Sequence, residues 1–252
     1  MGSAVRVGRI GVIVPSTNVN VEPDMYAMRP ESVSIHFART TYNLPQNVKT
    51  FEDMDIKTIE KLMVSLNEGV ITAAQQLSTA RVDVIAYTCT MGSFIKGPAA
   101  DQEFIDNIQK ASGVKAVTTS AAAVKAFQEM GVKNVAIAHP YSESGASHLK
   151  RYFEVSGIRI VGVHKPLEIP LREIATSSRE TIYQSVINAN NAEAEGVFIS
   201  CTDYQAVPAV RDLETRIGKP VVAANQCTLW AALRMLGIKD GVDGYGTLFN
   251  DF

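Results

Sequence analysis

Cysteine is scarce in this sequence. The three cysteines, Cys89, Cys201 and Cys227, are too few and too widely spaced for a disulfide framework. There is no CxxC pair, and the histidines do not have the spacing of metal ligands. We therefore expect free thiols, no metal ion and no organic cofactor.

An excess of charge of one sign is also missing, as are long apolar runs. Lys and Arg number 24 against 26 Asp and Glu, for a net charge of −2, and the basic residues form no dense run. This balance gives no support to a nucleic-acid groove or a membrane-surface patch. No segment approaches the ~18 uninterrupted apolar residues of a membrane span, and the first residues do not resemble a signal sequence, so we expect a cytoplasmic protein.

Short runs rich in Val and Ile alternate with longer segments of helical period. Continuous apolar runs are typical of parallel strands that are buried on both faces, and the alternation predicts an α/β fold. The predicted strands are 9–15, 33–38, 82–88, 133–139, 158–163, 196–200 and 220–224. The predicted helices lie near 56–79, 101–111, 119–130, 143–156, 178–193, 205–217 and 228–236.

The order of elements repeats coarsely along the chain. Two strands end in a Cys-Thr pair, in IAYTCTMGS (85–93) and in VFISCTDYQ (197–205). We read two lobes of similar topology with a changeover near Val117. The predicted N-terminal lobe comprises 1–117 plus 226–252, and the predicted C-terminal lobe comprises 118–225. No Pro-rich or low-complexity linker separates them, so we expect close packing.

Ligands of open parallel sheets bind beyond the carboxyl ends of the strands. If the two lobes face one cleft, Cys89 and Cys201 approach a shared ligand from opposite sides. The candidate residues at these strand ends are Ser16, Asn18, Cys89, Thr90, Tyr141, Cys201 and Thr202.

Two opposed thiols support a specific chemistry. Backbone N–H groups at a strand-to-helix turn can lower a thiol pKa below its ordinary value of ~8.5, and they can also bind a carboxylate. A thiolate and a thiol on opposite faces of a substrate can remove and return a proton. Alternatively, one adds to a double bond while the other protonates the neighbouring carbon. Neither route needs a cofactor.

Structural roles compete with these assignments. A cysteine at the end of a core strand is often inert packing. Asn18 equally fits a turn or a helix N-cap, and Tyr141 fits a packing role with its hydroxyl in water. We interpret Cys227 as structural, because it lies where a helix begins after a strand.

Five motifs together resemble the Asp/Glu racemase superfamily, especially its maleate cis–trans isomerase and arylmalonate decarboxylase branch. The resemblance spans nearly the whole chain, and it implies two pseudo-symmetric flavodoxin-like lobes, each a short, mostly parallel sheet flanked by helices, with the active site between them. Two-lobed enzymes of this family are often dimers, so we expect a homodimer or a higher homo-oligomer. The motifs are VPSTNVNVEPDM (14–25), YTCTMGS (87–93), HPY (139–141), ISCTDYQA (199–206) and AANQCTLWAAL (223–233).

The resemblance also implies a reaction on a small carboxylic acid. The decarboxylases of this branch carry glycine at the first cysteine, so the presence of both thiols favours isomerase or racemase chemistry. The resemblance implies that Cys89 adds to the alkene of a maleate-type acid and that Cys201 donates or accepts the proton. Asn18 and Tyr141 would hold the substrate carboxylates, helped by the backbone amides at Thr90 and Thr202, and Ser16 is a further substrate-binding candidate. The alternatives are an amino-acid or hydantoin-type racemase, an arylmalonate-type decarboxylase and a non-catalytic small-acid binding protein.

The sequence departs from the maleate isomerases at one point. Those enzymes have a further substrate-binding asparagine in the second lobe, and the corresponding stretch HKPLEIPLREIATSS (164–178) contains none. We expect Glu168 or Arg172 to line that part of the cleft. Another cis-unsaturated diacid, an α-substituted dicarboxylate or an amino-acid derivative therefore stays open as the substrate.

Overall fold

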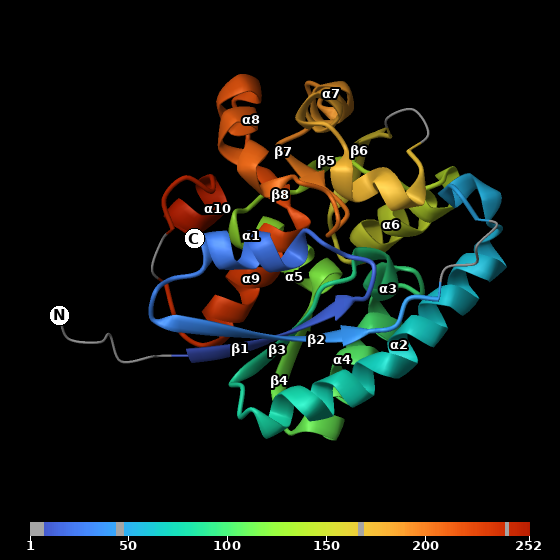
Figure 1. Ribbon diagram of the computed structural model, residues 1–252. Coiled ribbons are helices and arrows are strands. Elements are labelled where there is room, and N and C mark those ends of the chain that lie inside the picture. Colours follow the sequence, from blue (N-terminus) through green and yellow to red (C-terminus); the bar gives the residue numbers. More distant parts are fainter. Residues whose placement is uncertain (1–7, 44–47, 166–168, 240–241) are drawn as a thin grey trace.

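Two four-stranded parallel sheets form the framework of the protein (Figure 1). The computed structural model describes residues 8–43, 48–165, 169–239 and 242–252. The first sheet has the order β2-β1-β3-β4 and the second has the order β6-β5-β7-β8, so one topology occurs twice. This arrangement confirms the predicted α/β class with two similar halves. The strands are β1 (Gly8–Pro15), β2 (Val33–Thr40), β3 (Val84–Tyr87), β4 (Lys115–Thr118), β5 (Asn134–Ala138), β6 (Arg159–His164), β7 (Gly196–Ile199) and β8 (Val221–Ala223).

The sequence predicted seven of these strands and missed β4. That strand has only four residues, and it runs directly into α5 (Thr119–Glu129), whose first turn is capped by the Thr118 hydroxyl, 3.4 Å from the Ala121 amide. The predicted changeover near Val117 falls inside it. The sequence also missed α1 (Val21–Met28), a short helix without strong apolar periodicity.

Helices cover both faces of each sheet. On the outside of the first sheet lie α2 (Ile56–Thr79) and α4 (Pro98–Ser112), while α7 (Arg179–Ala189) and α8 (Val210–Ile217) cover the second (Figure 1). Between the sheets, α5 packs against α9 (Ala224–Met235), which contacts β3, β4 and β8. The shorter elements are α3 (Thr90–Phe94), α6 (Glu143–Val155), α10 (Thr247–Asp251) and the 3-10 turns η1 (Phe51–Asp53), η2 (Leu171–Thr176) and η3 (Val207–Ala209).

Side-chain caps explain why several helices begin where they do. The Asp55 carboxylate accepts the Thr58 amide at 2.7 Å before α2, and the Ser178 hydroxyl accepts the Thr181 amide at 3.1 Å before α7. Each cap satisfies an amide that has no partner within its own helix, which stabilises the start by about 1 kcal/mol.

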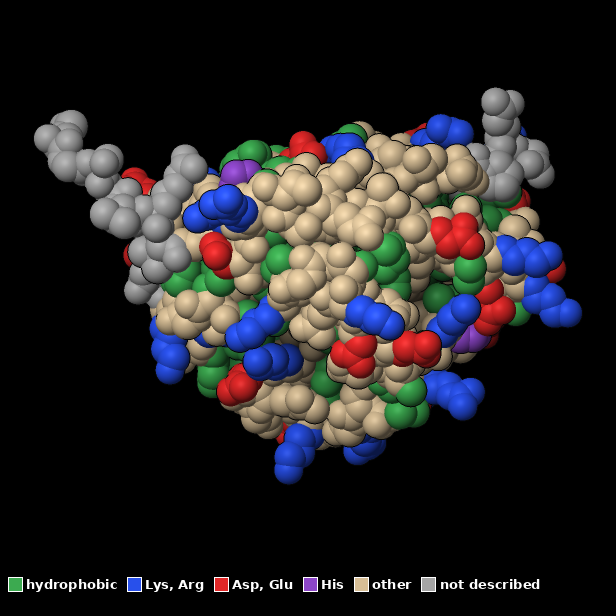
Figure 2. All heavy atoms as spheres, turned by 90° about the horizontal axis from the view of Figure 1, so that it is seen from below, with side chains coloured by type: hydrophobic (Ala, Val, Ile, Leu, Met, Phe, Trp, Pro, Cys, Tyr) green, Lys and Arg blue, Asp and Glu red, His purple; other side chains and the backbone are tan. Residues whose placement is uncertain are grey.

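The surface agrees with the balanced composition. On the face shown in Figure 2, acidic and basic side chains are interspersed, and neither sign gathers in one region. None of the helices in the described part of the chain has the length and apolar character needed to cross a membrane.

Candidate active site

A cavity of about 400 Å³ lies where the loops that follow β1, β3, β5 and β7 meet. Its wall combines residues from both halves of the chain with the turn η2. Six of the seven predicted site residues line it: Asn18, Cys89, Thr90, Tyr141, Cys201 and Thr202.

The two cysteines occupy equivalent positions in the two sheets. Cys89 follows β3 by two residues, and Cys201 follows β7 by two residues. The intervening residues are held alike, because the Thr88 amide donates to Ile13 at 3.0 Å and the Ser200 amide donates to Ala138 at 2.8 Å. Both thiols are half-buried at the wall of the same cavity. The repeated Cys-Thr pair therefore brings two sulfurs to one place.

Cys201 has an unusual backbone. Its φ is +123°, in a region that favours glycine, whereas Cys89 has an ordinary extended φ of −142°. A non-glycine residue in such a conformation costs about 1–3 kcal/mol, and strain of this kind gathers at functional sites.

Replacing Cys201 by glycine should therefore stabilise the fold. We expect the free energy of unfolding to rise by about 1 kcal/mol and the melting temperature by about 2–4 °C, as measured by calorimetry. Cys89→Gly is the matched control, because glycine relieves no strain at φ −142° and its extra chain entropy should lower the melting temperature. Equal effects of the two substitutions would contradict the strain at Cys201.

Burial raises the pKa of both cavity thiols. For Cys89 the amide of Gly92, 3.4 Å from the sulfur, works in the opposite direction, but removal from water outweighs it. The Asp203 carboxylate raises the pKa of Cys89 and that of Cys201 further. Backbone amides thus lower both thiol pKa values, as the sequence indicated they can, but desolvation of the thiolate is the larger effect and the net shift is upward.

Asn18 joins the loops of the two sheets. Its side-chain oxygen accepts the amides of Asn20 at 3.0 Å and Val21 at 2.9 Å, which fixes the start of α1. Its side-chain nitrogen donates to the Thr202 hydroxyl at 3.2 Å, and that hydroxyl donates to the Thr88 carbonyl at 3.1 Å. Asn18 therefore does serve as a turn residue. The second hydrogen of its amide nitrogen is still available to donate to a ligand.

Tyr141 and Thr90 both line the cavity, and each carries a hydroxyl group. The Tyr141 ring is buried between Phe51, Phe94 and His139, and its hydroxyl lies 3.2 Å from the Ser200 hydroxyl. The Thr90 hydroxyl is buried near the Tyr141 hydroxyl and lacks a well-formed hydrogen bond to any residue that the structure describes. A buried polar atom without a partner is costly unless a ligand satisfies it.

Ser16 does not line the cavity. Its exposed hydroxyl accepts the Tyr42 amide at 2.9 Å, and it is the Tyr42 side chain that lines the cavity. Burial and the proximity of both sulfurs raise the pKa of the Tyr42 phenol, which keeps it protonated as a donor. Tyr42 is the site residue that the sequence reasoning missed.

Arg172 is the single Lys or Arg in the described lining of the cavity. It lies on η2, is exposed, and has no ion pair or hydrogen bond with a described residue. Asp203 also lines the cavity, and its carboxylate accepts the Val19 amide at 3.1 Å. The other residue predicted for this region, Glu168, lies outside the described residues.

Known proteins resemble this chain in both sequence and fold. The maleate isomerase of Geobacillus stearothermophilus is 25% identical over 252 residues, covering 96% of this chain and 97% of its own. The arylmalonate decarboxylase of Bordetella bronchiseptica is 25% identical over 187 residues, covering 73% and 78%.

Among solved structures, one of the most similar is the maleate cis-trans isomerase of Nocardia farcinica, in a Cys→Ser variant with a covalently bound succinylcysteine intermediate. It superposes with a TM-score of 0.86 at 22% identity, covering 97% of this chain and 99% of that one. The sequence profile of the arylmalonate decarboxylase family matches residues 10–249. That match takes in both sheets and every residue of the cavity wall, and the chain therefore belongs to the arylmalonate decarboxylase family.

Proposed function

We propose that this protein is a cofactor-independent isomerase that converts a maleate-type cis-unsaturated dicarboxylate into its trans isomer through an adduct on Cys89. One observation carries the proposal: two thiols from equivalent strand ends line a single cavity. The curated relatives named maleate isomerase support it, as does the succinylcysteine of the Nocardia enzyme.

The reaction balances without any further reactant. The Cys89 thiolate adds to one alkene carbon, and the electron pair of the double bond moves to the neighbouring carbon, which takes a proton from the Cys201 thiol. The central bond of the resulting thioether is single and rotates. The Cys201 thiolate then removes the proton again, the C–S bond breaks, and the trans acid leaves with the Cys89 thiolate restored.

The wall of the cavity supplies donors for the two carboxylates. We assign the first carboxylate to the Asn18 side-chain nitrogen, the unpartnered Thr90 hydroxyl and the Tyr141 hydroxyl. We assign the second to Arg172, the single Lys or Arg in the described lining of the cavity. A guanidinium retains the preference for an anion at this end of the substrate.

Removing the Arg172 charge should weaken substrate binding. We expect Arg172→Gln to raise KM about tenfold, equivalent to about 1.4 kcal/mol, with a smaller change in kcat, because the exposed guanidinium binds the carboxylate equally before and during the reaction. Steady-state kinetics at two salt concentrations measure this effect.

Arg211→Gln on α8 is the matched control, since it removes the same charge from an exposed position outside the cavity lining. Arg172→Lys should recover part of the lost affinity, because the charge remains while the two-pronged geometry is lost. An unchanged KM in Arg172→Gln would show that the second carboxylate binds elsewhere.

The alternative reactions use fewer of these features. A racemase would use the same two thiols, but it would exchange a proton at a tetrahedral carbon, and a decarboxylase needs only one thiol as proton donor. A small-acid binding protein would use neither sulfur. The pair of thiols and the near full-length matches to maleate isomerases favour the isomerase.

Proton NMR in D₂O distinguishes these reactions directly. The purified protein is incubated with maleate, 2-methylmaleate, both enantiomers of aspartate and glutamate, and phenylmalonate. Appearance of the trans alkene is the expected result. Deuterium exchange at an α-carbon would instead identify a racemase, and loss of carbon dioxide from phenylmalonate would identify a decarboxylase. No conversion by wild-type protein, with ligand-induced stabilisation unaffected by Cys→Ser replacement, would favour the binding protein.

We also propose the division into 1–117 plus 226–252 and 118–225. The contacts of α9 with β3 and β4 support the return of the C-terminal segment to the first sheet. We propose further that the protein assembles as a homodimer or a higher homo-oligomer. We also propose that it is located in the cytoplasm.

A further inference from the structure

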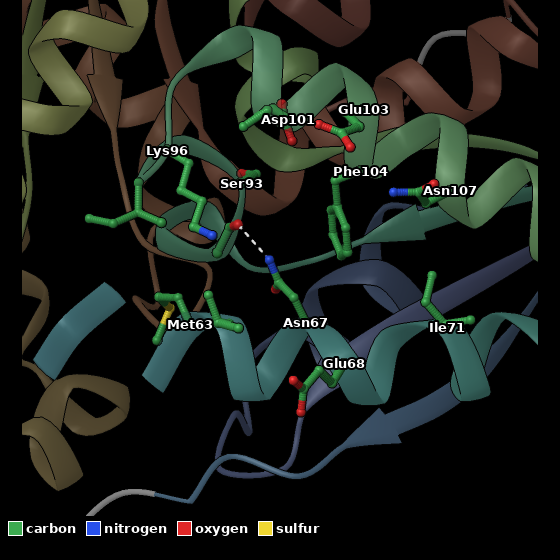
Figure 3. A pocket seen from close by; sticks show the side chains of 14 residues that line it. Met63, Asn67, Glu68, Ile71, Ser93, Lys96, Asp101, Glu103, Phe104 and Asn107 are labelled. Atoms are coloured by element: carbon green, nitrogen blue, oxygen red, sulfur yellow. Dashed lines mark hydrogen bonds between the residues drawn. The ribbon is translucent and has the colours of Figure 1, made fainter. Parts of the chain in front are cut away.

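Two residues close to Cys89, Tyr87 and Asn67, are not part of the described lining of the cavity that holds the cysteines. Tyr87, the last residue of β3, is fully buried, and its hydroxyl donates to the Asn67 side-chain oxygen at 2.8 Å. Asn67, on α2, is itself fixed, because its nitrogen donates to the Gly92 carbonyl at 3.1 Å (Figure 3). The Tyr87 hydroxyl and the Cys89 sulfur both lie close to the Cα of Gly92, and a hydrogen bond from the phenol to the thiolate opposes the rise in the Cys89 pKa that burial causes.

Gly92 shows how tightly this group is built. Its amide donates to the Cys89 sulfur at 3.4 Å. A methyl group on its Cα would lie 2.4 Å from the Tyr87 hydroxyl oxygen and 3.2 Å from the sulfur. The first distance is too short for any real contact, so the Tyr87 hydroxyl can occupy its place near the sulfur only because residue 92 has no side chain.

The second cysteine lacks this support. The residue equivalent to Tyr87 is Ile199, the last residue of β7, which also precedes its cysteine by two positions. An isoleucine side chain cannot donate a hydrogen bond. The two halves of the molecule thus share a topology but differ in the residue two positions before each cysteine, which is Tyr87 in the first half and Ile199 in the second.

We propose that Tyr87 is a positioning residue whose hydroxyl turns from Asn67 to the Cys89 sulfur when the thiol ionises, so that Cys89 rather than Cys201 becomes the nucleophile. The thiol proton leaves to solvent, and the phenol keeps its own proton throughout. In the thiol state the phenol oxygen is free to accept from the S–H, and in the thiolate state its O–H donates to the sulfur. No bond other than the S–H bond breaks.

A second cavity lowers the free-energy cost of rotating the Tyr87 hydroxyl away from Asn67. Asn67 is half-buried and lines a cavity of about 480 Å³ between α2 and α4, separate from the one that holds the cysteines (Figure 3). When the phenol turns away, the Asn67 oxygen can accept a hydrogen bond from water in that cavity, so no buried acceptor is left without a partner.

The inference rests on the proposed role of Cys89, but its test needs no substrate. Iodoacetamide alkylation of the whole protein is followed against pH, with Cys89 and Cys201 resolved as separate peptides by mass spectrometry. We expect Tyr87→Phe to raise the apparent pKa of Cys89 by about one unit, which slows its alkylation below the pKa about tenfold, and to leave Cys201 unchanged. In turnover, the acid limb of kcat/KM should move by the same amount and recover at high pH.

Two further variants keep the test decisive. Tyr152→Phe removes another buried hydroxyl that has an acceptor, Asp101 at 2.6 Å, and should leave the Cys89 profile unchanged. Gly92→Ala displaces the Tyr87 hydroxyl and should reproduce the selective shift. An unchanged Cys89 profile in Tyr87→Phe, or equal shifts of both cysteines, overturns the inference. A selective shift without turnover in the NMR panel would instead overturn only the proposed function.

Discussion

Cys89→Ser is expected to lose at least about ten-thousandfold in kcat/KM while keeping the fold. A serine hydroxyl is not appreciably ionised at neutral pH and is a far weaker nucleophile toward an alkene than a thiolate. Serine is nearly the same size, and its oxygen can still accept the Gly92 amide that now contacts the sulfur. The measurements are NMR-detected turnover, circular dichroism and the melting temperature.

Cys227→Ser is the matched control for this substitution. Cys227 is fully buried in α9, outside the cavity, and its thiol donates to the Ala224 carbonyl at 3.2 Å, as a serine hydroxyl can. We expect this variant to lose about 1 kcal/mol of stability and to retain the kcat/KM of wild type. Turnover that survives in Cys89→Ser would exclude the adduct mechanism.

Cys201→Ser should separate the two halves of the reaction. In this variant the serine hydroxyl or water supplies the proton that completes the adduct. Neither removes that proton again at the normal rate, so the adduct accumulates and turnover should fall by about 10²–10⁴-fold. The protein incubated with maleate should then gain the mass of one substrate molecule, and peptide mapping should place it on Cys89.

The double variant Cys89→Ser/Cys201→Ser should gain no mass under the same conditions. Mass gained on Cys201 in the Cys89→Ser single variant would reverse the assignment of the two cysteines. It would also remove the purpose that we infer for Tyr87, because that residue supports only the first sulfur.

The strand pattern and the repeated Cys-Thr pair were sufficient to predict the α/β class and the meeting of the two thiols. Both depend on local sequence: β-branched runs mark buried strands, and strand ends mark the ligand edge. Thr90, Tyr141 and Thr202 were found in the same way. Strand β4 escaped because four residues carry too little periodicity to distinguish a strand from the start of the helix that follows.

Features that depend on packing were beyond the sequence. Nothing local to Tyr42 signals that its ring enters the cavity, because the Ser16 hydroxyl that holds its amide comes from the turn after β1. The net rise in the thiol pKa values could not be predicted either, because the depth of burial is set by both halves of the chain together. The positive φ of Cys201 is likewise a property of the assembled loop.

The position of α9 has a consequence for synthesis on the ribosome. This helix covers β3 and β4, yet its first residue, Ala224, follows the end of β4 at Thr118 by 106 positions and the end of β3 at Tyr87 by 137. At about 5–20 residues per second, those strands are synthesised roughly 5–30 s before the helix that completes their core. During that interval the nascent first sheet has an apolar face that α9 does not yet cover, and exposed apolar surface of this kind is what chaperones bind.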